Sequence, residues 1–93
     1  MNAAKTQDTL TIPSKAESIN TVERLIDDLR TEFDIHEDVY GNILVAVTEA
    51  VNNAIFHGNQ SDPAKEVSLN YNKSTDKISF TIKDEGTGFD YYN

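Results

Sequence analysis

Residues 37–57 constrain the fold of this chain more than any other feature, because they predict one long helix with an unusual surface. From Ile43 to Ile55 the side chains are apolar on nearly every side of that helix. A helix that is apolar all round is normally buried, so we expect this one at the centre of the domain. The pair Gly58 and Asn59 suits a left-handed C-terminal cap, which predicts the end of the helix near His57.

A short strand and an amphipathic helix are expected before this segment. Residues 9–13 (TLTIP) alternate and end in proline, which favours a strand that stops there. Ser14 and Glu17 have the spacing of a capping box, so we expect them to begin the next helix. Apolar side chains then recur every three or four residues, which predicts one buried face. They are Ile19, Val22, Leu25, Ile26, Leu29 and Phe33.

Two alternating segments follow a loop at 60–64 and predict a β-hairpin. Residues 72–76 between them are rich in turn-forming types. One face of each expected strand is apolar, with Val67, Leu69 and Tyr71 on the first and Ile78, Phe80 and Ile82 on the second. The order strand, helix, helix, strand, strand predicts one α+β domain over residues 1–93. We expect a two-layer sandwich, with two helices packed on an antiparallel sheet.

Composition excludes several classes of function. Sixteen acidic and eight basic residues give a net charge of −8, which repels phosphate backbones, so we expect no direct binding to nucleic acid. No apolar run approaches the roughly 20 residues that a membrane-spanning helix needs. The polar start MNAAKTQDTL lacks the apolar segment of a signal peptide, and there is no cysteine. We therefore expect a cytoplasmic protein that has no membrane partner.

Three polar side chains interrupt the apolar helix at helical spacing. Glu49, Asn53 and His57 stand four residues apart, which places them on one stripe of an α-helix. An Asn oxygen suits Mg²⁺ beside phosphate oxygens, and a carboxylate one turn away can take a proton from a hydroxyl. Glu49 alone is equally consistent with a residue that meets water at the core edge. His57 alone is equally consistent with a helix-terminal residue that complements the dipole. The three together favour a lined cleft.

A second motif, DEGTGF at residues 84–89, follows the last expected strand. Asp84 has the parity of the inward-facing residues of that strand. A buried Asp needs a hydrogen-bond donor, and the exocyclic amine of a base supplies one. Gly86 and Gly88 allow the backbone to turn and to approach a ligand closely. By itself this spacing also describes many ordinary turns.

Together, TEAVNNAIFHG at 48–58 and DEGTGF at 84–89 resemble the histidine kinase-like, gyrase-type ATPase superfamily (the Bergerat fold), which includes sensor histidine kinases. Within it, the chain is most similar to the anti-sigma-factor serine/threonine kinases, and the resemblance extends over essentially all of the chain. It implies that Asn53 binds magnesium and that Glu49 is the catalytic carboxylate that activates the substrate hydroxyl. It also implies that Asp84 reads the adenine amino group, while Gly86 and Gly88 shape that edge of the pocket.

The resemblance implies an anti-sigma factor with ATP-dependent serine/threonine protein kinase activity that regulates bacterial transcription. Its cofactors would be ATP and Mg²⁺. Its partners would be a sigma factor, an antagonist (anti-anti-sigma) protein as the phosphorylation substrate, and a second copy in a homodimer. Two alternatives remain open: a non-catalytic module that only binds its partner, and the catalytic domain of a sensor histidine kinase.

The family pattern continues with a mobile ATP lid, a second glycine-rich motif and further strands, none of which follows Asn93 in this sequence. We expect a truncated domain in which the groups that enclose the phosphates are missing. Phosphoryl transfer depends on positioning and charge stabilisation, so this fragment should be weak or inactive, with the activity residing in a longer parent. The missing strands also predict an exposed sheet edge at 77–83.

Overall fold

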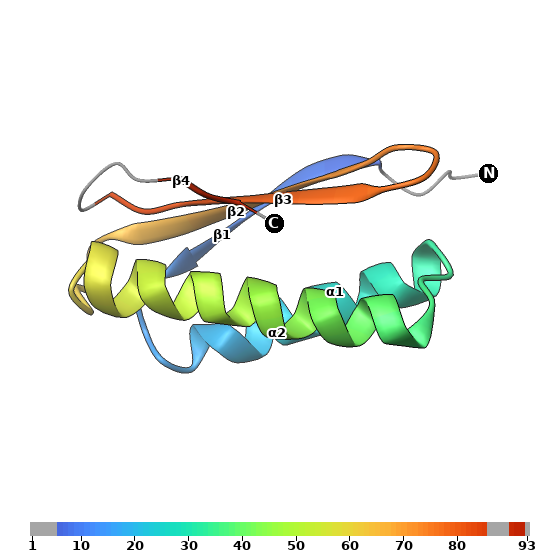
Figure 1. Ribbon diagram of the computed structural model, residues 1–93. Coiled ribbons are helices and arrows are strands. Elements are labelled where there is room, and N and C mark those ends of the chain that lie inside the picture. The colour runs from blue at the N-terminus through green and yellow to red at the C-terminus, as the bar shows by residue number, and fades with distance from the viewer. Residues whose placement is uncertain (1–5, 86–89, 93) are drawn as a thin grey trace.

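The computed structural model describes residues 6–85 and 90–92. Its elements in chain order are β1 (Gln7–Pro13), α1 (Ser18–Glu32), α2 (Glu37–Asn53), the π-helical turn η1 (Ala54–Gly58), β2 (Glu66–Lys73), β3 (Ile78–Lys83) and β4 (Asp90–Tyr92). The strands form one antiparallel sheet in the order β1-β2-β3-β4. Both long helices cover the same face of that sheet and run antiparallel to each other (Figure 1). The α+β sandwich expected from the sequence is confirmed.

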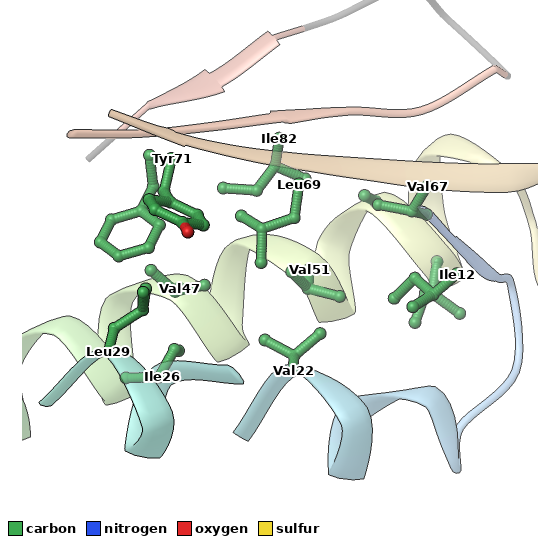
Figure 2. Close-up of a cluster of buried hydrophobic side chains, with 13 residues drawn as sticks. Ile12, Val22, Ile26, Leu29, Val47, Val51, Val67, Leu69, Tyr71 and Ile82 are labelled. Atoms are coloured by element: carbon green, nitrogen blue, oxygen red, sulfur yellow. The ribbon is translucent and has the colours of Figure 1, made fainter. Parts of the chain in front are cut away.

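The core lies between the helices and the sheet, as Figure 2 shows. The predicted inward face of the hairpin is confirmed, since Leu69 pairs with Ile82 and Tyr71 pairs with Phe80 in the β2–β3 register, and all four side chains are buried. Burying one large apolar side chain stabilises a fold by about 1.5–3 kcal/mol. The helices contribute Val22, Ile26 and Leu29 from α1 and Val47 and Val51 from α2.

The start of α1 differs from the expected capping box. The helix begins at Ser18, and Glu17 makes no side-chain cap hydrogen bond. Ser14 is instead buried and donates its hydroxyl to the Lys65 carbonyl at 2.7 Å. The Ser18 hydroxyl donates back to the carbonyl of Pro13 at 2.8 Å. The prediction was wrong because a tertiary hydrogen bond to the residue before β2 takes the serine that the local pattern assigned to the helix.

The second helix is not buried on all sides. Val47 and Val51 are fully buried, whereas Val45 is 64% exposed and Phe56 is also exposed. In a two-layer sandwich, α2 has only the sheet and α1 to pack against, so its remaining side faces solvent. The expectation of a central helix is therefore wrong. Within the described residues, no helix combines the length and the apolar character needed to cross a bilayer.

The sheet edge also differs from the expectation. β4 pairs antiparallel with β3, with Lys83 opposite Asp90, Ile82 opposite Tyr91 and Thr81 opposite Tyr92. The predicted bare edge at 77–83 is therefore wrong over 81–83. The last described residues, 90–92, supply a short strand that the sequence analysis did not anticipate. β1 forms the opposite edge of the sheet.

Candidate functional site

The two sequence motifs meet where η1 and β3 end. Asp84 follows the last residue of β3 and is only 8% exposed, so its predicted inward orientation is confirmed. Gly58, the last residue of η1, lies directly against it: a Cβ added there would collide with the Asp84 carboxylate and lie 3.0 Å from Asp84 Cβ. The absence of a side chain at Gly58 therefore makes the space in which the carboxylate sits. Such close approach is a use for which glycine is suited.

A widened turn carries the chain from α2 to this contact. Asn59 N donates to the carbonyl of Ala54 at 2.8 Å, and Ser61 N donates to that of Ile55 at 2.8 Å. The first of these is the i→i+5 pattern of a π-helix, which often occurs at functional sites. The predicted left-handed cap at Gly58 and Asn59 is wrong, because Asn59 has φ −94°. Positive φ occurs instead at Gln60 and Ser61, with φ 53° and 57°.

The polar stripe is kept only in part. Glu49 and Asn53 both belong to α2 and stand one turn apart, with Glu49 exposed and Asn53 half-buried. His57 lies beyond the start of η1 and is exposed. The α-helical spacing that aligned His57 with the other two does not hold across a π-helical turn. The structure thus places one accessible carboxylate and one amide on α2, immediately before the turn that leads to Asp84.

Asn59 ties the corner of the domain together, a role that sequence reasoning missed. Its side chain is fully buried, and its Nδ2 donates to Ser14 Oγ at 2.8 Å and to the Glu66 carbonyl at 3.0 Å. Its Oδ1 accepts from the backbone N of Glu85 at 2.7 Å. In the sequence, the Gly58–Asn59 pair was the only indication of this role, and it also fits a helix cap. A buried network of amide hydrogen bonds leaves no local sequence pattern that would distinguish the two.

The glycine part of the second motif is not described. Gly86 and Gly88 lie outside the described residues, so their expected part in shaping the pocket stays a prediction. The carboxylate of Glu85 accepts a hydrogen bond from the backbone N of Glu66. Together with the Asn59 bond, this contact fixes the chain where it leaves β3. Asp84 is therefore held between a defined strand end and a defined helix end.

The arrangement has a definite chemical capacity. The carboxylate of Asp84 is a hydrogen-bond acceptor, and an amine on a planar ring is a donor that suits it. Asn53 offers a neutral oxygen of the kind that Mg²⁺ accepts. Glu49 is exposed, so an incoming hydroxyl can reach it, and an ionised carboxylate accepts protons.

One protein family and several known proteins are similar to this chain in sequence. The family model for the histidine kinase-like ATPase domain matches residues 12–93. Serine-protein kinase RsbW of Bacillus licheniformis is 25% identical over 81 residues, which are 87% of this chain and 51% of that protein. The anti-sigma F factor of Clostridium perfringens is 43% identical over 49 residues, 53% of this chain and 35% of that protein. The anti-sigma F factor of Oceanobacillus iheyensis is 38% identical over 58 residues, 62% and 40% of the two chains.

The chain spans about half the length of the RsbW proteins that it matches, and less of the anti-sigma F factors. Its relationship to these anti-sigma-factor kinases is distant in sequence. The family match, however, covers both motifs, both long helices and the hairpin. Because that match extends over most of the chain and agrees with the observed sandwich, the chain belongs to the histidine kinase-like ATPase domain family.

Proposed function

We propose that this chain is the nucleotide-binding part of an anti-sigma factor with ATP-dependent serine/threonine protein kinase activity. The observation that carries the proposal is the burial of the Asp84 carboxylate against Gly58, at the point where the two motifs meet. A carboxylate at this position is a hydrogen-bond acceptor of the kind that the amino group of a base can use. Its position at the end of the helix that bears Glu49 and Asn53 fits a site that reads a base at one end and phosphates at the other.

In this proposal Asp84 binds the adenine amino group, and the backbone at Gly86 and Gly88 forms the adjoining edge of the pocket. Asn53 holds Mg²⁺ through its amide oxygen, together with phosphate oxygens. Bound Mg²⁺·ATP supplies the phosphoryl group and the charge that stabilises its transfer. Because this chain is acidic overall, the cation also lowers the repulsion of the phosphates.

Glu49 is the proposed catalytic carboxylate. It lies one helical turn before Asn53 and is exposed, so a serine or threonine of a protein substrate can reach it. In that position Glu49 takes the proton of the attacking hydroxyl, which makes the oxygen a better nucleophile. The name of one relative, serine-protein kinase RsbW, supports the proposed kinase activity, and the name anti-sigma F factor supports the proposed anti-sigma role.

The anti-sigma F factors among the relatives support a sigma factor as a partner. We also propose an antagonist protein as the phosphorylation substrate and a second copy of the chain in a homodimer. Residues 1–93 belong, in this proposal, to one ATPase domain.

Calorimetric titration of the chain with Mg²⁺·ATP tests the proposal. We expect saturable binding that weakens about tenfold or more in Asp84→Asn, which replaces a charge-assisted hydrogen bond by a neutral one. Asn53→Ala should weaken binding only when Mg²⁺ is present. His57→Ala, an exposed residue of the same helical end, is the matched control and should leave the affinity unchanged. Wild-type binding that neither Asp84→Asn nor Asn53→Ala affects would refute the assigned site.

The kinase assignment has its own readout. Glu49→Gln should leave the affinity for Mg²⁺·ATP within about twofold, because Glu49 acts on the substrate hydroxyl, yet reduce phosphate transfer to a protein substrate by about 100-fold or more, the usual contribution of a positioned base. Equal transfer by the wild type and Glu49→Gln would remove Glu49 from the mechanism.

A further inference from the structure

We propose that Asn59 is the positioning residue for Asp84, and that through it Asn59 sets the preference of the site for an adenine base. The inference rests on the proposed nucleotide function for its ligand, although its structural part is independent of any ligand. Asn59 itself has none of the binding or catalytic roles proposed above. It acts on the site only through the backbone that carries Asp84.

The side chain of Asn59 is fully buried, and both its nitrogen and its oxygen form hydrogen bonds. Both Nδ2 donors are bound, one to Ser14 Oγ at 2.8 Å and one to the Glu66 carbonyl at 3.0 Å. Its Oδ1 accepts from Glu85 N at 2.7 Å. The segments after β1, at the start of β2 and after β3 thus all converge on one amide that directly follows η1. A buried amide with every polar atom satisfied specifies a unique arrangement, which apolar packing does not.

The bond to Glu85 N reaches Asp84 directly. That N–H belongs to the peptide unit between Asp84 and Glu85, and a peptide unit is planar. Fixing its N–H therefore restrains the Cα of Asp84 as well. On the other side of Asp84, the strand pairing of Lys83 with Ser68 restrains the preceding residue.

The neighbour of Asn59 in sequence holds the other end of the same residue. Gly58 lies against the Asp84 carboxylate so closely that a Cβ there would collide with it. The dipeptide Gly58–Asn59 thus makes space for the Asp84 side chain and binds its backbone. The π-helical turn places both residues, since Asn59 N closes that turn on the Ala54 carbonyl at 2.8 Å.

Ser14 provides a matched control within the same network. Ser14→Ala removes one acceptor from Asn59 Nδ2 and the hydroxyl that donates to Lys65 O, but leaves the Oδ1 bond to Glu85 N in place. Asn59→Ala removes all three Asn59 bonds. A purely structural role for Asn59 predicts similar behaviour for Ser14→Ala and Asn59→Ala, whereas positioning through Glu85 separates them.

The experiment combines two readouts on the 93-residue chain. The first is NMR of the amides of Gly58, Asp84 and Glu85 without nucleotide, including the hydrogen-exchange rate of Glu85. The second is the ratio of the affinities for ATP and ITP, whose base carries a carbonyl in place of the adenine amino group. We expect Asn59→Ala to expose the Glu85 amide, shift the Asp84 and Gly58 signals, and lower the ATP/ITP ratio about tenfold by weakening ATP alone. Ser14→Ala should keep both the protection and the ratio.

Across the variants, the ratio should follow the protection of the Glu85 amide. If Asn59→Ala does not fold, the wild type still tests the structural part, because an unprotected Glu85 amide there would overturn the proposal. An unchanged ratio in a folded variant that has lost the protection would overturn the proposal, as would equal losses of ATP and ITP affinity. If the wild type bound neither nucleotide, the proposed function would fail instead. In that event, the role of Asn59 would be overturned if the Glu85 amide of Asn59→Ala exchanged rapidly while the Asp84 and Gly58 signals kept their wild-type positions.

Discussion

Two helical glycines of this chain should respond in opposite ways to the same substitution. A Cβ on Gly41, in α2, meets nothing within 4 Å, whereas a Cβ on Gly58 collides with the Asp84 carboxylate. Neither glycine has a positive φ, so alanine fits the backbone at both. Alanine in place of a helical glycine stabilises by about 0.5–1 kcal/mol, which we expect in full for Gly41→Ala.

Gly58→Ala should lose that gain and more. Forcing extra atoms into a packed site costs about 1–3 kcal/mol, and here the atoms displaced belong to a buried carboxylate. The net result is a destabilisation of about 0–2.5 kcal/mol, and the two alanine variants should differ by about 1–3 kcal/mol. For a domain of this size each kcal/mol moves Tm by about 4–8 °C, so thermal melts followed by circular dichroism resolve the difference.

A double-mutant cycle isolates the cause of that difference. In an Asp84→Ala background the carboxylate is gone and only the Cβ contact at 3.0 Å remains, so Gly58→Ala should cost much less stability than it does in the wild type. If Gly58→Ala stabilised the wild-type chain as much as Gly41→Ala, the carboxylate would not lie over Gly58, and the proposed base-reading site would lose its main support.

Two further predictions concern stability. Burial first, then the negative charges of Asp8 and Glu32, raise the pKa of Tyr71 above its ordinary value of 10.0. The folded state therefore binds the phenolic proton more tightly than the unfolded state does. The resulting contribution to the free energy of unfolding is complete below pH 10 and is lost as pH rises through the raised pKa of Tyr71. Urea midpoints between pH 8 and 11 should therefore fall more steeply for the wild type than for Tyr71→Phe. Leu69→Ala, in the buried core, should lower the free energy of unfolding by about 2–5 kcal/mol. Val45→Ala, on the exposed side of α2, should change it by no more than about 0.5 kcal/mol. Comparable urea midpoints for the two variants would contradict this pattern of burial.

The sandwich could be predicted from the sequence because alternation and helical periodicity report which face of each element is buried. Leu69, Phe80 and Ile82 follow the period of two, and Val22, Ile26 and Leu29 follow the helical one. The extent of burial was harder to predict. An apolar residue such as Val45 looks the same in sequence whether or not another layer covers it, so the exposed side of α2 was missed.

The motifs of the candidate site could be predicted from the sequence, but the hydrogen bonds that connect its elements could not. The inward direction of Asp84 followed from strand parity. The link between Asn59 and Glu85 spans residues far apart in the chain, and Ser14 gave a local capping pattern that a distant carbonyl overrode. Side-chain hydrogen bonds between separate elements leave no period in a sequence, which is why this network emerged only from the structure.

The π-helical turn makes this helix end tolerant of a change in length. Because η1 contains one residue more than an α-helical turn needs, deleting one of its exposed residues, Phe56 or His57, would let the Asn59 N–H reach the Ala54 carbonyl in the ordinary i→i+4 pattern. The same two backbone groups would still be joined, so Gly58 and Asn59 would keep their places beside Asp84 and Glu85. A one-codon deletion inside 54–58 should therefore disturb this corner less than one inside α2, which would rotate everything after it about the helix axis by roughly 100°.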